Sequence, residues 1–186
     1  MNFFLSLDKR LFCHLNGWAP PFFDYLNFFI TFFGEGIVAL IIFIGWYILR
    51  RRRVALLGIG SLAVSGIISR ILKIVFARPR PLAILTSVHT FGYLFRYSSF
   101  PSGHATTIFA AVTILSFSYK RFAPLFYSFA IAVAYSRIYL GLHWPSDLIA
   151  GGAIGYSVSK LFLKMQPRIF PTQKIGTHPN FSAQNR

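Results

Sequence analysis

Long apolar runs separated by short polar or basic segments dominate this chain. Four of the runs approach the ~20 residues that a helix needs to cross a bilayer, and they cover residues 54–77, 102–119, 122–140 and 146–163. Two shorter runs, residues 22–33 and 37–49, lie on either side of a Gly-Glu-Gly turn. With their flanks included, these two bring the expected number of spanning helices to six, and a re-entrant pair is the alternative.

The first residues of the chain predict a helix of a different kind. Over residues 2–16 apolar side chains recur at helical spacing with Lys9 and Arg10 opposite them, a pattern typical of a helix that lies in the membrane surface. From residue 166 onward the chain is polar. We therefore predict an all-α integral membrane six-helix bundle with an N-terminal interfacial helix, built as one domain over residues 1–165, with a polar cytoplasmic tail over residues 166–186.

The composition supports a membrane protein. Hydrophobic residues make up 55% of the chain and charged residues only 12%, whereas a soluble domain carries about 25% charged residues. The chain contains 22 Phe and has a mean hydropathy of +0.57. A single cysteine excludes an internal disulfide and a cysteine-based metal cluster.

The charge balance sets the expected orientation. Of 19 Lys and Arg residues, 13 fall on one predicted side of the bundle: Lys9, Arg10, Arg50, Arg51, Arg52, Arg53, Lys120, Arg121, Lys160, Lys164, Arg168, Lys174 and Arg186. The positive-inside rule makes this side cytoplasmic, with both termini on it. Because the basic residues are interleaved with apolar runs, we expect no nucleic-acid partner.

Three motifs lie on the opposite side, together with the remaining basic residues. They are Lys-x6-Arg-Pro over residues 73–81, Pro-Ser-Gly-His over residues 101–104, and Ser-Arg-x5-His-x3-Asp over residues 136–147. Each motif alone has weak to moderate specificity, but three in order on one face of a bundle indicate a functional site. Four residues on this side are left without an assigned role: Arg70, Arg78, His89 and Arg96.

The cations and the helix start in these motifs predict a phosphate site. Lys73, Arg80 and Arg137 offer positive charge and N–H donors, and guanidinium groups bind phosphate oxygens in pairs. Ser102 and Gly103 stand at the start of an apolar run, where free N–H groups suit an anion and glycine permits its close approach. The Ser102 hydroxyl can cap the helix or bind a phosphate oxygen.

Two histidines and one aspartate supply candidate reactive groups. His143 and Asp147 are four residues apart, which places them on one face if both lie in a helix. Because Pro145 favours the first helical turn, His143 can instead lie just outside the helix, and the contact then depends on the loop. A carboxylate on one imidazole nitrogen leaves the other free to attack. His104 is suited to protonate a leaving group and then activate water, and Asp147 is the only carboxylate expected near the site.

Together the three motifs resemble the signature of the type 2 phosphatidic acid phosphatase (PAP2) superfamily, which they match without departure over residues 73–147. The resemblance implies a six-helix bundle and hydrolysis of a phosphomonoester or diphosphate through a phosphohistidine, without a metal or cofactor. It implies that His143 is the nucleophile, that Asp147 orients it, and that His104 is the general acid and then the base. The implied phosphate ligands are Lys73, Arg80, Ser102, Gly103 and Arg137.

The compact chain is similar to bacterial members that act on lipids, with the site at the outer face of the inner membrane. By that analogy the expected substrate is undecaprenyl diphosphate or lipid A 1-phosphate, ahead of phosphatidylglycerophosphate and phosphatidate. A lipid phosphotransferase would use the same residues. Vanadium haloperoxidases have a similar oxyanion pocket but are soluble, and a lipid or anion transporter would leave the pairing of His143 with Asp147 unexplained.

Overall fold

The computed structural model of the chain describes residues 2–17, 20–92 and 95–170, with side chains from residue 6 onward. All regular structure in these ranges is helical, which confirms the all-α prediction. The tail was predicted to begin at residue 166, but helix α8 continues to Ile169. The rest of the predicted tail, residues 171–186, lies outside the described residues. The helices are α1 (Asn2–Gly17), η1 (Pro21–Phe23), α2 (Asp24–Phe32), α3 (Gly36–Ile48), α4 (Arg52–Phe76), α5 (Pro81–Ile84), α6 (Gly103–Ser118), η2 (Lys120–Phe122), α7 (Ala123–Tyr139) and α8 (Pro145–Ile169).

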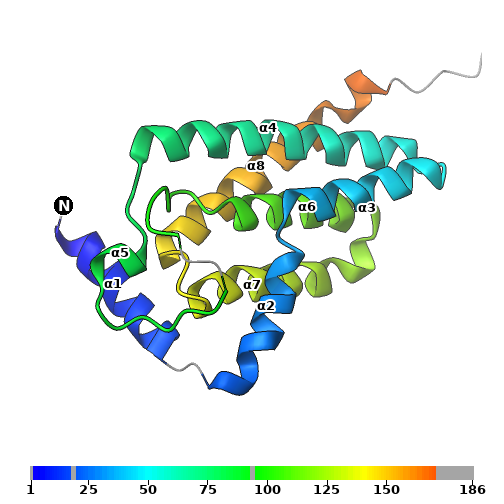
Figure 1. Cartoon of the computed structure of the whole chain (residues 1–186). Coiled ribbons are helices and arrows are strands. Elements are labelled where there is room, and N and C mark those ends of the chain that lie inside the picture. The colour runs from blue at the N-terminus through cyan, green and yellow to red at the C-terminus, as the bar shows by residue number, and fades with distance from the viewer. Residues whose placement is uncertain (1, 18–19, 93–94, 171–186) are drawn as a thin grey trace, which may run out of the picture.

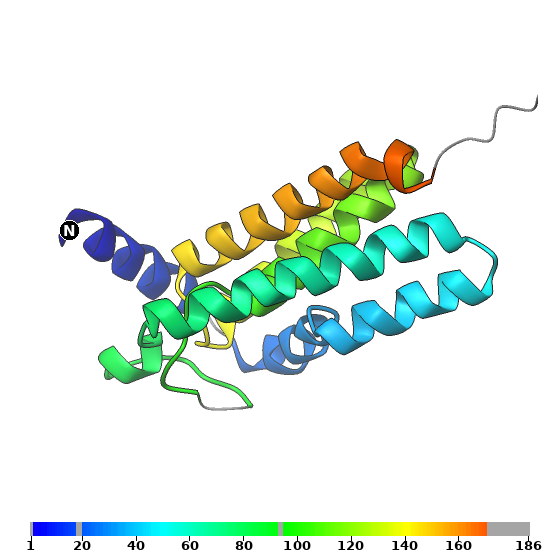
Figure 2. The same ribbon diagram turned by 90° about the horizontal axis from the view of Figure 1, so that it is seen from above.

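Helices α2 and α3 continue one another as a bent rod that packs beside α4 and α7 (Figure 2). They meet with a bend of 51° around Glu35, whose backbone is extended and which has a glycine on each side. By length and apolar composition, Arg52–Ile84 is long enough to cross a bilayer, and α2 with α3 passes the same test only jointly. The runs 22–33 and 37–49 therefore form a broken span or a re-entrant pair. The first possibility was not predicted, and the second is the alternative that the sequence left open to two separate crossings.

The two ends of the described chain lie at opposite ends of the bundle (Figure 1). Helix α1 packs where α4 ends and α8 begins, because Asp8 on α1 forms an ion pair with Arg78. Helix α8 ends on the other side, beside the α3–α4 turn. Lys9 and Arg10 therefore lie on the side opposite to residues 50–53. The prediction that all of them share one side is wrong. The physical reason is that α2 and α3 form one rod and not two. The chain then passes through five rods from α1 to the end of α8 (α2 with α3, α4, α6, α7 and α8), and an odd number of passes places its two ends on opposite sides.

Close packing of α6 against α8 brings two of the motifs together. A Cβ atom at Gly151 or Gly155 of α8 would collide with the carbonyl oxygens of Ser102 or Thr106 on the α6 side. Small residues let helices approach in this way, and such contacts replace the hydrophobic driving force that is absent between helices in lipid. As a result, the Ser102 backbone N–H donates to the Asp147 carbonyl oxygen at 2.9 Å.

The outer surface of the rods is apolar. Large aliphatic side chains remain more than half exposed on α3, α4, α7 and α8, among them Ile37 at 67%, Ile74 at 74%, Leu125 at 64% and Ile149 at 74%. A protein in water rarely exposes apolar residues so widely, whereas lipid hydrocarbon solvates them. The described surface is that of a membrane protein.

Candidate active site

His143 and Asp147 come together where α7 is followed by α8. Helix α8 begins at Pro145, so His143 lies in the preceding loop. The His143 Nδ1 atom lies 3.4 Å from Asp147 Oδ2, and both side chains are buried. The four-residue spacing thus produces the contact through loop geometry and not through one helix face.

Asp147 is held by three donors besides His143. Its Oδ2 atom accepts hydrogen bonds from the Trp144 backbone N–H at 2.9 Å and from the Ser99 hydroxyl. Its Oδ1 atom accepts one from the Arg78 guanidinium at 2.7 Å. A carboxylate held in this way can fix the His143 tautomer through Nδ1 and leave Nε2 as the free nitrogen.

The surroundings of His143 keep its imidazole neutral. Burial lowers the pKa of His143 well below its ordinary value, and the positive charges of Arg80, Arg137 and Lys73 lower it further. A neutral imidazole carries the lone pair that a nucleophile requires. Burial also lowers the pKa of Arg80, although a guanidinium remains charged at neutral pH.

Two of the predicted phosphate ligands are fixed by backbone carbonyls. Lys73 Nζ donates to Ser98 O at 2.9 Å. Arg80 donates from Nε to Tyr97 O at 2.9 Å and from NH1 to Leu142 O at 3.0 Å. Arg80 therefore links the loop between α5 and α6 to the loop that carries the nucleophile, and both cations keep further N–H groups for a ligand.

Arg137 has an unused donor inside the protein. One guanidinium nitrogen, NH1, donates to the Thr31 hydroxyl at 2.8 Å. The Nε atom is buried and has no hydrogen-bond partner among the described residues. A buried N–H without an acceptor costs about 1–3 kcal/mol, so this donor marks a place where an anionic ligand would complete the structure.

The Pro-Ser-Gly-His motif forms the start of α6. The Ser102 hydroxyl caps the helix by accepting from Ala105 N at 3.4 Å, which is one of its two predicted roles. At Gly103, an added Cβ would have no heavy atom within 4 Å. With Lys73 and His104, Gly103 lines a cavity of about 240 Å³, so the backbone at the helix start faces open space.

A second carboxylate, Glu35, belongs to the site. Its Oε1 atom lies 3.1 Å from His104 Nε2. Glu35 comes from the bend between α2 and α3, far from the motifs in sequence. The expectation that Asp147 is the only carboxylate near the site is therefore wrong. A charged residue inside an apolar region is a signal that could have pointed to Glu35.

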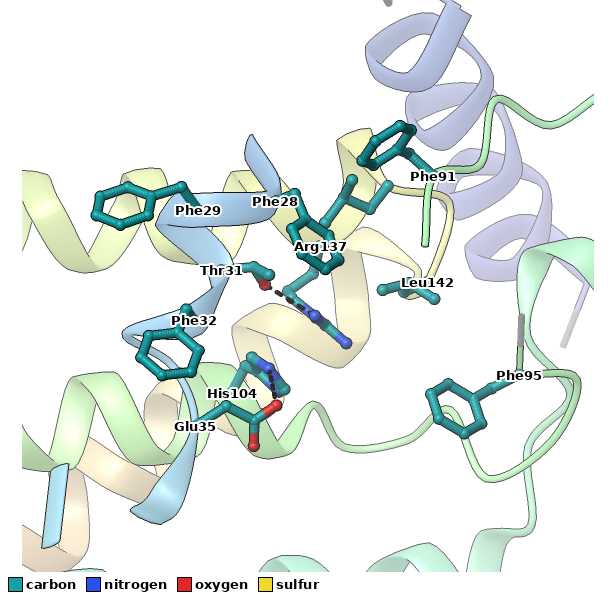
Figure 3. Close-up of a pocket in the computed structure, with 11 residues that line it drawn as sticks. Phe28, Phe29, Thr31, Phe32, Glu35, Phe91, Phe95, His104, Arg137 and Leu142 are labelled. Atoms are coloured by element: carbon teal, nitrogen blue, oxygen red, sulfur yellow. Dashed lines mark hydrogen bonds and ion pairs between the residues drawn. The ribbon is translucent and has the colours of Figure 1, made fainter. Parts of the chain in front are cut away.

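A larger cavity of about 560 Å³ adjoins His104 and Arg137 (Figure 3). Figure 3 shows the rings of Phe29 and Phe32 on one side of these two polar side chains and that of Phe95 on the other. The remaining lining residues are Phe28, Thr31, Glu35, Phe91, Leu140 and Leu142. The cavity therefore joins an aromatic wall to the charged groups of the motifs.

The structure shows the contacts of the four residues that the sequence left without a role. Arg78 enters the site through Asp147 and also pairs with Asp8 at 2.6 Å. His89 pairs with Asp24 at 2.8 Å, and its ring packs against that of Tyr139 at 5.2 Å. Arg70 lines the smaller cavity, and Arg96 accepts the Arg80 N–H through its backbone carbonyl.

The arrangement has the parts that phosphoryl transfer to a histidine needs. A neutral imidazole is held by a carboxylate, a second imidazole lies against Glu35, and Lys73, Arg80 and Arg137 surround the first imidazole with positive charge. Such charges stabilise the equatorial oxygens of a transferring phosphoryl group.

Comparison with known proteins agrees with this geometry. Residues 54–171 match the profile of the family described as the PAP2 superfamily. The chain is 32% identical over 118 residues to the undecaprenyl-diphosphatase of Sulfolobus acidocaldarius, covering 63% of this chain and 57% of that protein. It is 30% identical over 128 residues to the lipid A 1-phosphatase of Rhizobium etli, covering 61% and 55%. The match thus spans little more than half the length of these two relatives.

Two further similarities cover more of the chain. The lipid A 4'-phosphatase of Porphyromonas gingivalis is 29% identical over 180 residues, covering 89% of this chain and 75% of that protein. The crystal structure of Aquifex aeolicus LpxE superposes with a TM-score of 0.78 at 28% identity, covering 83% of this chain and 93% of that one. The likeness therefore extends from the motifs to the arrangement of the helices.

Proposed function

Because the chain belongs to the PAP2 superfamily, we propose that it is a membrane lipid phosphatase that works through a phosphohistidine. The observation that carries the proposal is the buried, neutral His143 held by Asp147 among the charges of Lys73, Arg80 and Arg137. A neutral nucleophile in a cationic pocket suits an anionic phosphorus centre.

In the first step, His143 attacks the phosphorus of the lipid phosphate. A nitrogen–phosphorus bond forms while the bond from phosphorus to the leaving oxygen breaks. His104 gives a proton to that oxygen. Meanwhile Lys73, Arg80 and Arg137, with the free N–H groups at the start of α6, balance the charge on the other phosphate oxygens.

In the second step, water attacks the phosphorus of the phosphohistidine. His104 takes a proton from the water, the nitrogen–phosphorus bond breaks, and inorganic phosphate leaves. His143 is then neutral again. Glu35, at 3.1 Å from His104 Nε2, is placed to hold that ring and to balance its charge whenever it is protonated.

The larger cavity favours a polyprenyl diphosphate. Its wall beside Arg137 is built from five phenylalanines and two leucines. A polyprenyl chain is apolar up to the carbon that bears the diphosphate, whereas the 1-phosphate of lipid A adjoins a sugar whose hydroxyl groups need polar partners. We therefore place undecaprenyl diphosphate first and lipid A 1-phosphate second.

We place the site at the outer face of the cell membrane. The opposite end of the bundle carries a run of four arginines, residues 50–53, and the basic side chains of η2 and of the second half of α8. Basic residues on the site side include the motif cations, whose position the phosphate explains. Setting those aside, the positive-inside rule puts the end of α8 in the cytoplasm.

Phosphate release by the purified protein in detergent tests the proposed function. The substrates are undecaprenyl diphosphate, lipid A, phosphatidylglycerophosphate and phosphatidate, each run beside a His143→Ala preparation. We expect the highest kcat/KM with undecaprenyl diphosphate, because its apolar chain matches the aromatic wall of the cavity. Release from no substrate, or equal release by the variant preparation, would contradict the proposal.

Chelation tests the source of the positive charge. We expect excess EDTA to leave the rate unchanged, because three side-chain cations, Lys73, Arg80 and Arg137, already act on the reacting centre. The measurement is initial rate with and without EDTA in metal-free buffer. A loss of activity that a divalent ion restores would show that the charge comes from a bound metal.

A further inference from the structure

The inward face of α1 is formed by three residues at four-residue spacing. Asp8, Phe12 and Asn16 are 6%, 0% and 3% exposed, as expected for one helix face, where residues i and i+4 lie above one another. Leu7 and Leu11 are 43% and 44% exposed. Helix α1 is thus held against the bundle by a partly polar face, and Leu7 and Leu11 lie outside this contact.

Asp8 binds the first turn of α8. Its Oδ1 atom accepts from the Ser146 N–H at 3.0 Å, and its Oδ2 atom accepts from the Ser146 hydroxyl at 2.6 Å. The free N–H groups of a first turn favour a carboxylate, so Asp8 serves as a cap supplied by another helix. Oδ2 also accepts from Arg78 at 2.6 Å. Arg78 donates in turn to Asp147, so one guanidinium joins the α1 carboxylate to the carboxylate that holds the nucleophile.

The other end of α1 binds the last turn of α7. Asn16 Nδ2 donates to Ile138 O at 3.0 Å and to Tyr139 O at 2.9 Å, where carbonyls at a helix end lack partners within the helix. Between the two ends, the ring of Phe12 packs against that of Trp144 at 5.3 Å. The loop with the nucleophile runs from the end of α7 to the start of α8, so α1 contacts both of its anchor points.

We propose that α1 supports the catalytic centre from outside, in that Asp8, acting through Arg78, is a positioning residue for Asp147. The inference rests on the proposed function for the role of His143. Without the Asp8 carboxylate, Arg78 loses one of its two anionic partners and no longer holds Asp147 Oδ1 in place. Loss of a residue that orients a metal-binding histidine lowers activity by about 10–100-fold, and we expect a loss of similar size here.

The test uses Asp8→Asn, Arg78→Gln and their double variant in the full chain. Asp8→Asn should lower kcat by about 10-fold or more and change KM by less than about twofold, because Asp8 acts on the nucleophile and not on the substrate. The double variant should be no slower than the slower single variant, since both changes break one connection. Additive losses of kcat would contradict the inference.

The matched control is Asp24→Asn. Asp24 is another buried carboxylate, on α2, where it accepts from the Tyr139 hydroxyl at 2.8 Å and pairs with His89. Asp24 has no hydrogen bond to Arg78 or Asp147 among the described residues, so the same isosteric change there should cost stability but lower kcat much less than Asp8→Asn does. If kcat falls equally in both variants, in step with their melting temperatures, Asp8 is merely structural and the inference is wrong.

A readout that needs no substrate separates this inference from the proposed function. In protein labelled with ¹⁵N-histidine, the imidazole signals of His143 are those lost in His143→Gln. Asp8→Asn should shift these signals because the carboxylate that fixes the tautomer is disturbed, and Asp24→Asn should not. Unshifted signals would overturn the inference, whereas a wild-type protein that releases no phosphate would overturn only the proposed function.

Discussion

His143→Ala is expected to lower kcat on the best substrate by at least ~10⁴-fold, because the variant has no nitrogen that can form the bond to phosphorus. Burial and the neighbouring cations lower the pKa of His143, so the wild-type imidazole is neutral and ready at neutral pH. No other imidazole of the described chain is paired with Asp147. The measurement is phosphate release under single-turnover and steady-state conditions.

The control for this variant is His14→Ala, since His14 lies exposed on α1. Its kcat should stay near that of wild type. Size-exclusion chromatography and thermal unfolding in detergent should show that His143→Ala remains folded. If folded His143→Ala keeps a rate near that of wild type, the assignment of the nucleophile is wrong.

His104→Ala is expected to affect substrates unequally, according to how much their leaving group needs a proton. For phosphatidate, which expels an alkoxide, the loss in the rate of phosphoenzyme formation should be about 10²–10⁴-fold. For a diphosphate, which expels a phosphate, the loss should be much smaller, because that leaving group is stable as an anion. The measurement is the single-turnover rate at which the leaving group is released from each substrate. Steady-state kcat would not separate the two substrates, because hydrolysis of the phosphoenzyme also needs His104 and is common to both.

Glu35→Gln should reproduce this inequality in weaker form, because Glu35 contacts His104 and not the nucleophile. A glutamine keeps the size of the side chain and removes its charge. Equal losses on the two substrates in His104→Ala would mean that His104 does not protonate the leaving group, and its role in the first step would then be limited to binding phosphate.

The four long apolar runs predict the long helices to within a few residues, except at the end of α8. The run 54–77 corresponds to Arg52–Phe76, and the run 102–119 to Gly103–Ser118. Runs of this length have one stable form in a bilayer, which is a helix that satisfies its own backbone. The shorter runs on either side of Glu35 carried no such constraint, because their pattern does not say whether the chain turns back or only bends. The bend in turn decided on which side α1 lies.

The motifs placed their own residues correctly at one end of the bundle, but they did not reveal the partners from other helices. Glu35 reaches His104, and Asp8 reaches Arg78 across 70 residues of sequence. A lone carboxylate has no spacing pattern, so only the packing of α1 and of the α2–α3 bend shows what it touches. On α1, the apolar spacing indicated a helix in the membrane surface, and it did not show that Asp8 holds this helix to the bundle through an ion pair and capping bonds.

Trapping of the covalent intermediate shows whether the phosphoryl group passes through His143. His104→Ala should form the phosphoenzyme from a diphosphate and hydrolyse it slowly, because the base that activates water is missing. Rapid acid-free quenching, proteolysis and mass spectrometry would then locate the phosphoryl group. We predict the phosphoryl group on His143, and no bound phosphoryl group when His143 is also changed to alanine. A phosphoryl group on another residue, or one that is still bound in the variant with both His104→Ala and His143→Ala, would contradict a mechanism through His143.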